Sequence, residues 1–398
     1  MIILVLNCGS SSIKYKLFDM SSETELAQGG IERIGMADSF LKLMLPNGEK
    51  AKLVKSIPGH QEGVDFILET LTDKTYGCLK SLNEIQAVGH RVVHGGEKFN
   101  SSVRITQAVV DQIRDCIELA PLHNPANLIG IEAIEKSLPL VPQVAVFDTA
   151  FHQTMPAKAY MYGLPYEYYT KYGIRRYGFH GTSHRYVSKR ACELLGVKFK
   201  DQKIITAHIG NGASLTAIKD GKSIDTTMGM TPLDGLLMGT RSGEIDAGVL
   251  TFISDKEQKN FGEISDLLNK HSGVLGVSGV SSDMREIEDA VKAGHQRATL
   301  AMDMYDYRIR KYIGAYAAAL GGLDILVFTG GVGENQWQTR EVVCADLEFM
   351  GLEFDVLKNK GLRSQEAIIS LPESKVTVIV VPTEEEKMIA LDTLHILM

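Results

Sequence analysis

Two segments half a chain apart share one pattern: an apolar strand, a glycine-rich polar turn and a second alternating segment. The first covers 2–18 and turns at 7–12, and the second covers 204–218 and turns at 208–214. An apolar strand, a short polar turn and a second, alternating strand predict a β-hairpin, not a strand that feeds a helix. Two such hairpins, separated by about half of the 398 residues, predict an internal duplication.

Short apolar runs alternate with segments of helical spacing in the rest of the chain, which is typical of an α/β fold. No low-complexity linker divides the chain, so the repeat alone sets the expected domains. These are 1–150 with a returning helix at 386–398, and 151–385. The expected strands are 143–147, 324–328 and 376–381, and the expected helices are 111–119, 296–320, 337–350 and 384–396, with Gly351 ending the third helix.

The charge and the cysteine content of the chain limit its partners and its compartment. The net charge is −7 and no strong basic run occurs, which argues against a nucleic-acid partner. No stretch approaches the roughly 18 apolar residues of a membrane span, and the N-terminus is typical of a strand, not of a signal peptide. Five scattered cysteines match neither a disulfide framework nor a zinc site, which favours a cytoplasmic protein.

Four glycine-rich turns, each expected after an apolar strand, are candidates for binding phosphate: 7–12, 208–214, 278–283 and 330–335. Glycine lets backbone N–H groups approach a phosphate, and hydroxyl side chains add donors. No Gly-Lys-Ser/Thr follows, so these turns are not Walker loops. Gln336 stands where a dinucleotide fingerprint needs its third glycine, which disfavours a nicotinamide dehydrogenase.

Three charged side chains lie where an anion site is expected. Arg91 and Arg241 are both close to glycines, and the planar guanidinium matches a carboxylate or a phosphate with two hydrogen bonds. Asp148 follows the expected strand 143–147, where active groups of α/β proteins often lie, although an aspartate there also serves as a helix N-cap.

Two further groups of residues can be interpreted either as functional or as structural. His180 and His184 have the i, i+4 spacing of a metal pair, but the intervening glycine favours structural histidines. Residues 384–386 are three glutamates at the start of the last expected helix, where negative charge also suits the positive end of the helix dipole.

Six segments, taken in chain order, resemble the acetokinase family over nearly the whole chain. They are 7–14, 147–156, 178–184, 208–212, 281–285 and 331–335. The resemblance implies an α/β fold of two duplicated actin-like (ribonuclease H-like) domains with an ATP cleft between them, shared with actin, sugar kinases and heat-shock chaperones. It also implies a homodimer joined through the second domain.

The resemblance assigns ATP, ADP and a divalent cation to residues of this sequence. Asn7 and Glu385 would bind magnesium, with manganese as a substitute. Glu384 stays an alternative to Glu385, because the run of three glutamates leaves the match open by one position. The residues that would hold ATP or ADP are Asn7, Ser10, Ser12, Lys14, His208, Ile209, Gly210, Asn211, Gly212, Asp283, Met284, Arg285, Gly331, Val332, Gly333, Glu334 and Asn335.

The reaction that the resemblance implies is the reversible transfer of the γ-phosphoryl group of ATP to acetate, giving acetyl phosphate and ADP. Arg91 would bind the substrate carboxylate. The residues that would serve the transferring phosphoryl group are Asp148, His180 and Arg241, together with Arg91. The residues that would line the methyl pocket are Val93, Leu122, Phe179 and Pro232.

The acceptor in such a reaction needs no general base. A free carboxylate has a pKa of about 4.3 and is already ionised at pH 7. Asp148 is therefore expected to orient magnesium or its water more than to take a proton, although the second role stays open. The harder problem is that one anion approaches another, and Arg91, Arg241, His180 and magnesium would cancel that repulsion.

Two alternative functions stay open. One methylene changes discrimination by only about 1–3 kcal/mol, so the motifs do not separate acetate from propionate or butyrate. A non-catalytic nucleotide switch of the actin type would share the glycine turns. Such a switch needs no arginine beside an apolar pocket, so Arg91 together with Val93 favours a kinase.

Overall fold

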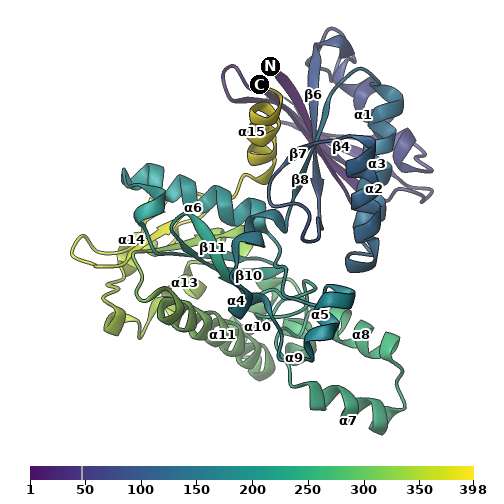
Figure 1. The fold of residues 1–398 in the computed structure, drawn as a ribbon. Helices are drawn as coiled ribbons and strands as arrows, with labels where there is room; N and C mark the ends of the chain where they lie inside the picture. The colour runs from purple at the N-terminus through teal and green to yellow at the C-terminus, as the bar shows by residue number, and fades with distance from the viewer. Residues whose placement is uncertain (46–47) are drawn as a thin grey trace. The chain divides into compact units, whose positions relative to one another are not determined.

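The computed structural model describes residues 1–45 and 48–398. Its contacts divide the chain into two compact units, which are described separately. Unit 1 comprises Met1–Gln153 and Glu384–Met398, and unit 2 comprises Thr154–Thr383. In Figure 1 the yellow C-terminal helix lies beside the purple N-terminal strand, so both ends of the chain belong to unit 1 and contact each other there.

The described part of unit 1 is built on one eight-stranded sheet with the order β5-β4-β3-β2-β1-β6-β8-β7. Consecutive strands from β1 to β5 pair antiparallel, whereas β1, β6 and β8 run parallel to one another. The predicted first hairpin is therefore confirmed. The strands are β1 (Ile2–Cys8), β2 (Ser12–Asp19), β3 (Thr24–Glu32), β4 (Phe40–Met44), β5 (Lys50–Val54), β6 (Ile85–Val92), β7 (Val103–Arg104) and β8 (Gln143–Phe147).

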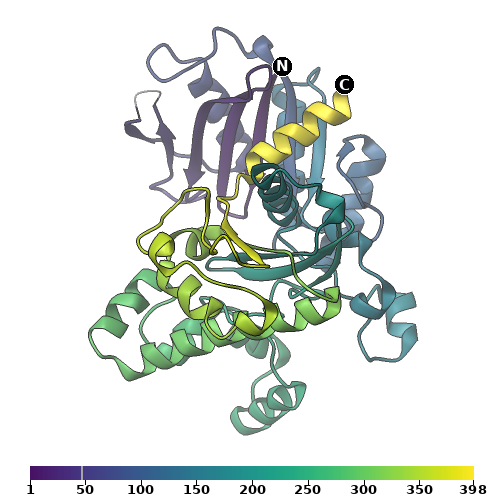
Figure 2. The ribbon, with the colours of Figure 1, turned by 90° about the vertical axis from the view of Figure 1, so that its left-hand side faces the viewer.

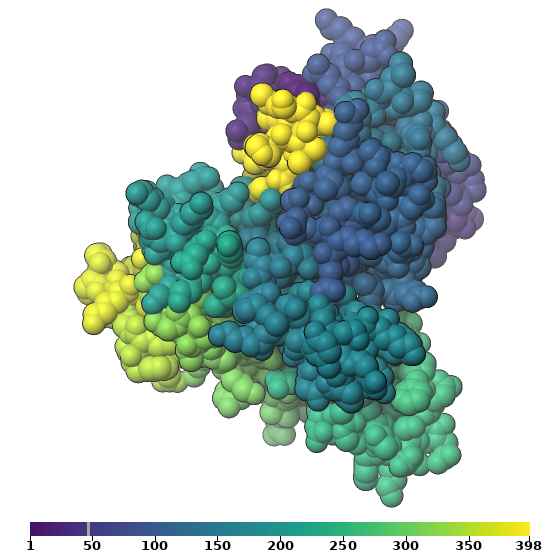
Figure 3. All heavy atoms as spheres, in the orientation of Figure 1, coloured from purple at the N-terminus to yellow at the C-terminus, as the bar shows by residue number. Residues whose placement is uncertain are grey.

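Helices cover both faces of the parallel strands of unit 1, which explains why these strands are almost continuously apolar. In Figures 1 and 2, α15 lies across one face, and Figure 1 shows α1, α2 and α3 on the other. Figure 3 shows the outer side of α15 at the surface. The helices are α1 (His60–Leu71), α2 (Gln107–Asp115), α3 (Asn124–Ser137) and α15 (Glu385–Leu397).

A glycine in β6 lets α15 approach the sheet closely. A Cβ atom on Gly89 would lie 2.5 Å from Thr393 Oγ1 and 2.7 Å from Ile389 Cγ2, which is too close for any side chain. Ile389 and Ala390 are buried against Ile3 and Val5 of β1. This packing fixes the N-terminal end of α15 near the C-terminal ends of the parallel strands.

Unit 2 repeats the central part of unit 1. Its sheet has the order β11-β10-β9-β12-β14-β13 among the described residues, so its first five positions carry the same pattern of antiparallel and parallel pairs as β3-β2-β1-β6-β8. The predicted fold class, two duplicated actin-like α/β units, is confirmed. The strands are β9 (Ile204–Ile209), β10 (Ala213–Lys219), β11 (Lys222–Thr226), β12 (Ile325–Thr329), β13 (Ala367–Ile368) and β14 (Thr377–Val380).

The long helix α11 packs on β9 and β10, and α6 packs on β9 and β12. The predicted bounds of α11 are those observed, and α15 differs from its prediction by one residue at each end. The helices of unit 2 are α4 (Ala157–Tyr160), α5 (Tyr166–Tyr172), α6 (Gly181–Leu195), α7 (Ala247–Glu257), α8 (Phe261–Lys270), α9 (Gly273–Ser278), α10 (Met284–Lys292), α11 (Gln296–Leu320), α12 (Gly330–Asn335), α13 (Trp337–Cys344) and α14 (Val356–Asn359).

Four local predictions were wrong. The glycine-rich turn expected at 330–335 is the short helix α12. The turn 278–283 follows the short helix α9 and not a strand. Gly273 begins this helix and Gly279 follows its last residue, and both glycines have a left-handed backbone. The helix predicted over 337–350 stops at Cys344, since Ala345 is extended and Asp346 has a φ of 63°. The helix predicted over 111–119 begins earlier and becomes a 3₁₀ turn after Asp115.

The described residues contain no helix that is both long and apolar enough to cross a membrane. All five cysteines are free thiols, and four of them are buried.

Candidate active site

Arg91 and Asp148 form an enclosed ion pair at the ends of two neighbouring parallel strands of unit 1. Arg91 lies in β6, and Asp148 directly follows β8. The Arg91 Nε donates to both carboxylate oxygens at 3.1 Å, and Nη2 donates to Oδ2 at 2.6 Å. The Arg91 Nη1 donates to the side-chain oxygen of Asn7 at 3.3 Å. Three of the five N–H groups of a guanidinium are thus used within unit 1.

These contacts give Asp148 an orienting role towards Arg91. Its side chain is 1% exposed, and both of its oxygens accept hydrogen bonds from the guanidinium. Burial acts to lower the pKa of Arg91, but the charges of Asp148 and Glu385 outweigh that effect and raise the pKa. The cation is therefore permanent, and its orientation is fixed by a bidentate partner.

Glu385, the first residue of α15, faces this same cluster, whereas Glu384 is exposed at the N-cap. Burial raises the pKa of Glu385 to about 7, Arg91 opposes the rise, and Asp148 adds to it. Glu386 adds to the rise as well, and Lys14 opposes it together with Arg91, so Glu385 lies among two acidic and two basic side chains. Of the two glutamates between which the sequence left a choice, Glu385 is the one beside Arg91.

The donor chemistry of Asn7 and Glu385 fits magnesium. This ion prefers oxygen ligands, keeps several waters and usually takes only one or two carboxylates besides substrate phosphates. Within 1–45 and 48–398, no group of three or more His, Cys, Asp or Glu side chains could hold a metal. A cation bound by Asn7 and Glu385 would thus have one amide and one carboxylate ligand from these two residues.

Arg241 and His180 converge over Gly212 in unit 2. A Cβ atom built on Gly212 would lie 3.4 Å from Arg241 Nη1 and 3.8 Å from His180 Nε2. Arg241 Nη1 donates to the carbonyl oxygen of Pro232 at 3.1 Å. Burial lowers the pKa of Arg241, and no acidic side chain of the described residues forms an ion pair with it. The second hairpin thus carries a cation without a counter-ion above its turn.

The imidazole of His180 is fixed by its neighbours in an unusual backbone conformation. His180 precedes α6 with a φ of 56°, a left-handed conformation that costs free energy in a residue with a side chain. Its Nδ1 lies 2.9 Å from Ser214 Oγ, and its ring stacks on that of His208 at 4.2 Å. This arrangement directs the other ring nitrogen towards Gly212.

His184 has a structural role. It is fully buried, its Nδ1 lies 2.7 Å from Thr206 Oγ1, and its Nε2 lies 2.7 Å from Ser214 Oγ. Both ring nitrogens therefore have hydroxyl partners, which leaves none for a metal. The favoured interpretation of this histidine as structural agrees with these contacts.

Three of the predicted nucleotide segments of unit 2 line one pocket of about 660 Å³. The pocket is lined at its hairpin end by Gly210 and Asn211. The other predicted residues in its wall are Asp283, Met284, Arg285, Gly331, Val332 and Asn335. His208, Ile209, Gly212, Gly333 and Glu334 are outside this wall. The pocket has the size and the glycine-rich wall of a small-ligand site.

Some of the residues outside the wall support the pocket. Glu334 accepts from the N–H of Gly330 at 2.9 Å and from that of Thr383 at 3.1 Å, so it holds the start of α12. The fully buried Arg340 donates to the carbonyl oxygen of Gly333 at 2.8 Å. Burial lowers the pKa of Arg340 to about 10, and it remains a cation beneath the glycine turn.

The sequence analysis missed three residues of the pocket wall, Glu288, Gln336 and Arg363, whereas Ser282 lies in the candidate turn 278–283. Arg363 lies two residues after Gly361. The criterion that selected Arg91 and Arg241, an arginine close to a glycine, would therefore have found it. Glu288 and Gln336 had no comparable signal, because each is an ordinary polar position of a helix or helix end.

The remaining predicted site residues have varied positions. In unit 1, Ser10 is exposed in the turn after β1, and Lys14 lies opposite Asn7 in the hairpin. Ser12 begins β2 and accepts from the N–H of Gly9 at 2.8 Å. Their assignment to ATP stays a prediction.

The four residues predicted to line a methyl pocket are divided between the units. Val93 and Leu122 belong to unit 1, where Val93 is 5% exposed and Leu122 is 76% exposed. Phe179 and Pro232 belong to unit 2, where Phe179 is 3% exposed. Pro232 is also the residue whose carbonyl oxygen holds Arg241. The pocket itself stays a prediction.

These features are typical of a phosphotransferase built from two duplicated α/β units. They are the glycine-rich pocket of unit 2 and the pair of Arg241 and His180 above the turn of its hairpin. The chain belongs to the acetokinase family, whose sequence model matches residues 2–391. It is 67% identical over 395 residues to an acetate kinase of Parabacteroides distasonis, a match that covers 99% of each chain.

Two solved structures are similar to the whole chain. The crystal structure of Porphyromonas gingivalis acetate kinase superposes with a TM-score of 0.98 at 65% identity, covering 100% of both chains. A propionate kinase from Francisella tularensis superposes with a TM-score of 0.92 at 42% identity, covering 99% of both chains. Both neighbours are kinases of short carboxylic acids, so the fold extends over that class.

Proposed function

We propose that the protein is an acetate kinase, which transfers the γ-phosphoryl group of ATP reversibly to acetate and forms acetyl phosphate and ADP. The observation that carries the proposal is the convergence of Arg241 and His180 over Gly212, in the same unit as a pocket of about 660 Å³ that the predicted nucleotide segments line. Among the described residues, no acidic side chain forms an ion pair with Arg241. The relatives reported above, most of them acetate kinases, support the same activity.

ATP would occupy the pocket of unit 2. Backbone N–H groups of the turn at Gly331 and Val332 offer donors to its phosphates, and the N–H of Asn211 lies at the hairpin end. Arg285 is 84% exposed beside the pocket and is fixed by Asp283, whose Oδ2 it contacts at 2.6 Å. That ion pair keeps the guanidinium in position before the nucleotide arrives.

Arg91 would bind the carboxylate of the acid. Its Nε edge is occupied by Asp148, so the acid would use N–H groups on the other side of the guanidinium. The acid is ionised at pH 7, so its oxygen can attack phosphorus without losing a proton. We therefore assign to Asp148 the orientation of Arg91, and no proton transfer.

Arg241 and His180 would stabilise the transferring phosphoryl group, whose charge must be neutralised while two anions meet. Asn7 and Glu385 would hold magnesium, with manganese as a substitute. The bound ion would supply further neutralisation of phosphate charge. The geometry of Arg241 and His180 is set by protein contacts before substrate binds, which is the arrangement that electrostatic catalysis requires.

The magnesium assignment makes a prediction that separates two neighbouring glutamates. Glu385→Gln removes a carboxylate oxygen beside Arg91, so the magnesium concentration for half-maximal activity should rise about 10-fold or more. Glu384→Gln is the matched control and should leave the magnesium curve unchanged, because Glu384 is exposed. Activity titrated against magnesium checks both variants, and a larger effect from the control would assign the ion to Glu384.

A hydroxylamine trap for acyl phosphates tests the function directly. Purified protein with ATP, magnesium and formate, acetate, propionate or butyrate should form acyl hydroxamate, with acetate giving the highest kcat/KM. The absence of hydroxamate with every acid would remove the kinase proposal. The alternative, a nucleotide switch, would hydrolyse ATP slowly without any acyl product.

Propionate is the second candidate substrate, favoured by the similarity to the Francisella tularensis propionate kinase. The physical difference between the acids is one methylene, worth about 1–3 kcal/mol in an apolar pocket. Residues that would meet this methylene therefore decide the preference, and Val93 is the most enclosed of those in unit 1.

Val93→Ala should shift preference towards the longer acid. Removing two methyl groups enlarges the pocket, so the kcat/KM ratio of propionate to acetate should rise about 5- to 50-fold. The control is Val54→Ala, because Val54 lies in β5 and is 70% exposed. This variant should leave the ratio unchanged. The hydroxamate assay with both acids measures the ratio, and an unchanged ratio in Val93→Ala would remove this residue from the pocket.

We further propose a cytoplasmic homodimer formed through unit 2. Helix α7 has no buried residue, and its Phe252 side chain is 63% exposed. Phe261, at the start of α8, is 95% exposed. A second copy of the chain would cover such apolar side chains. Light scattering on the purified protein should give twice the mass of 43.7 kDa, and the monomer mass would contradict the proposal.

A further inference from the structure

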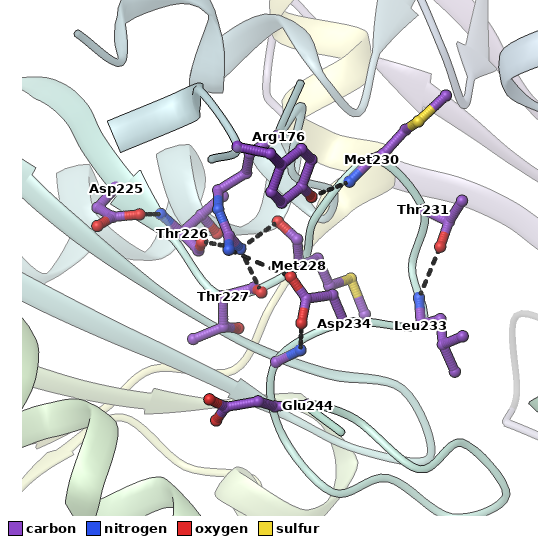
Figure 4. A network of polar contacts seen from close by, with 12 residues as sticks. Arg176, Asp225, Thr226, Thr227, Met228, Met230, Thr231, Leu233, Asp234 and Glu244 are labelled. Atoms are coloured by element: carbon purple, nitrogen blue, oxygen red, sulfur yellow. Dashed lines mark hydrogen bonds and ion pairs between the residues drawn. The ribbon is translucent and has the colours of Figure 1, made fainter. Parts of the chain in front are cut away.

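Four consecutive backbone carbonyls of unit 2 accept hydrogen bonds from three consecutive residues, 176–178. Figure 4 shows the contacts that Arg176 makes. The N–H groups of Tyr177 and Gly178 both donate to the carbonyl oxygen of Gly229, at 3.0 and 3.2 Å. The Arg176 Nη1 donates to three carbonyl oxygens, those of Thr226 at 2.9 Å, Thr227 at 2.6 Å and Met228 at 3.1 Å.

A guanidinium is needed to hold carbonyls in this arrangement. Oxygens that converge on one point repel one another, and a delocalised cation offsets that repulsion. The second nitrogen, Nη2, donates to Asp234 Oδ2 at 3.1 Å, which fixes the plane of the guanidinium. Arg176 therefore connects the end of β11 with the loop that follows it.

The loop after β11 is closely enclosed as well as hydrogen-bonded. The hydroxyl of Tyr162 accepts from the N–H of Met230 at 2.9 Å. A Cβ atom on Gly229 would lie 2.4 Å from that hydroxyl and 2.8 Å from Asp234 Oδ2. With so little free space, the backbone has one available position, and a shift of the arginine must be transmitted along the loop.

Both segments joined by Arg176 lead to groups that would act on the phosphoryl group. Residues 176–178 continue after one residue into His180, with its left-handed backbone. The loop continues after Met230 to Pro232, whose carbonyl oxygen accepts from Arg241 at 3.1 Å. Arg176 is thus connected through the backbone to His180, and through the loop and Pro232 to Arg241, the two side chains that converge over Gly212.

We infer that Arg176 is a positioning residue for phosphoryl transfer, which sets the place of His180 and of Arg241 through the carbonyls of 226–228. The inference rests on the proposed function. Arg176 does not line the nucleotide pocket, so its loss should act on turnover and not on the binding of ATP.

Kinetics of Arg176→Lys test the inference. Lysine keeps the charge but loses the planar fork, so it cannot hold three carbonyls and Asp234 at once. A displacement of about 1 Å at the reacting groups costs about 100-fold in rate, so kcat should fall about 10- to 100-fold while KM for ATP stays within about threefold. Asp234→Asn, which keeps an accepting oxygen, should lower kcat by less than about fivefold.

Arg190→Lys is the matched control, because Arg190 is a half-exposed arginine of unit 2 paired with Glu366. All variants are assayed well below their melting temperatures. If wild-type protein is active and Arg176→Lys keeps the kcat of the control, the inference fails while the proposed function stands. An equal loss in kcat and in ATP affinity also overturns it, because that result indicates general disruption.

Tyr162→Phe covers the case in which Arg176→Lys does not fold. This variant removes only the hydroxyl that accepts from Met230, so the loop loses one anchor and the protein keeps its core. We expect kcat to fall about 3- to 10-fold with an unchanged KM for ATP. A normal kcat in this variant would contradict the positioning role of the loop.

Discussion

Arg241→Ala is expected to lower kcat about 1,000-fold or more, by analogy with the loss of an arginine that stabilises a transferring phosphoryl group. The side chain lies beside His180 above Gly212 and has no acidic partner in the described chain, so no carboxylate of the described residues neutralises its charge. ATP affinity should change by less than about fivefold, because the pocket wall is formed by other residues.

The control for this variant is Arg114→Ala, which removes a half-exposed arginine of α2 paired with Asp111 and Glu132. Steady-state kinetics give kcat, and calorimetric titration gives the dissociation constant of ATP. A turnover near that of the control would exclude Arg241 from the reaction. A parallel loss of ATP binding would assign it to the nucleotide instead.

Gly212→Ala should be the second most damaging change, although it adds only one methyl group. The new Cβ would lie at ordinary contact distance, 3.4 Å from Arg241 and 3.7 Å from the His180 ring, so the protein should fold. The methyl would occupy the space that a phosphoryl oxygen needs between these groups. We expect kcat to fall about 100-fold, the magnitude associated with a displacement of about 1 Å.

A matched glycine separates this steric effect from a backbone effect. Gly314 lies within α11, and a Cβ there meets no atom within 4 Å. Gly314→Ala should leave kcat unchanged and raise stability by about 0.5–1 kcal/mol, because alanine favours a helix more than glycine does. Thermal unfolding and kinetics check both variants. Normal turnover in a folded Gly212→Ala protein would show that the space above this glycine is not used.

The duplicated fold was predictable because its evidence is local. Each hairpin has a polar turn that contains glycine between two strands, and the parallel strands β1 and β12 are almost continuously apolar because helices cover both faces of the sheet. The helix after Trp337 was less predictable. Asp346 adopts a left-handed backbone that ends α13, and it is held by Arg310, a residue 36 positions away. Such a contact leaves no signal in the local pattern.

The site was predictable where a chemical group stands beside glycine. Arg91 and Arg241 were found by that criterion, and the same criterion applied to Gly361 would have found Arg363. Arg176 was not found, because its function depends on carbonyls that lie 50 residues later in the chain. Backbone acceptors carry no side-chain signature, so no reading of residue types would have revealed them.

The choice between Glu384 and Glu385 shows what packing adds to a motif. Three successive glutamates are equivalent in the sequence, but only one orientation of α15 lets Ile389 and Thr393 pack on Gly89. That orientation places Glu385 beside Arg91 and leaves Glu384 exposed. The helix face, set by the packing of residues four and eight positions further along, places Glu385 and not Glu384 beside Arg91.

The most direct test of the whole account follows both products of the reaction by ³¹P NMR, with ATP, magnesium and acetate as the starting mixture. The account predicts that an acyl phosphate resonance and ADP appear together in equal amounts, and that Arg241→Ala suppresses both. ADP accompanied by inorganic phosphate from the first time point, with no acyl phosphate, would contradict the account and identify an ATPase instead.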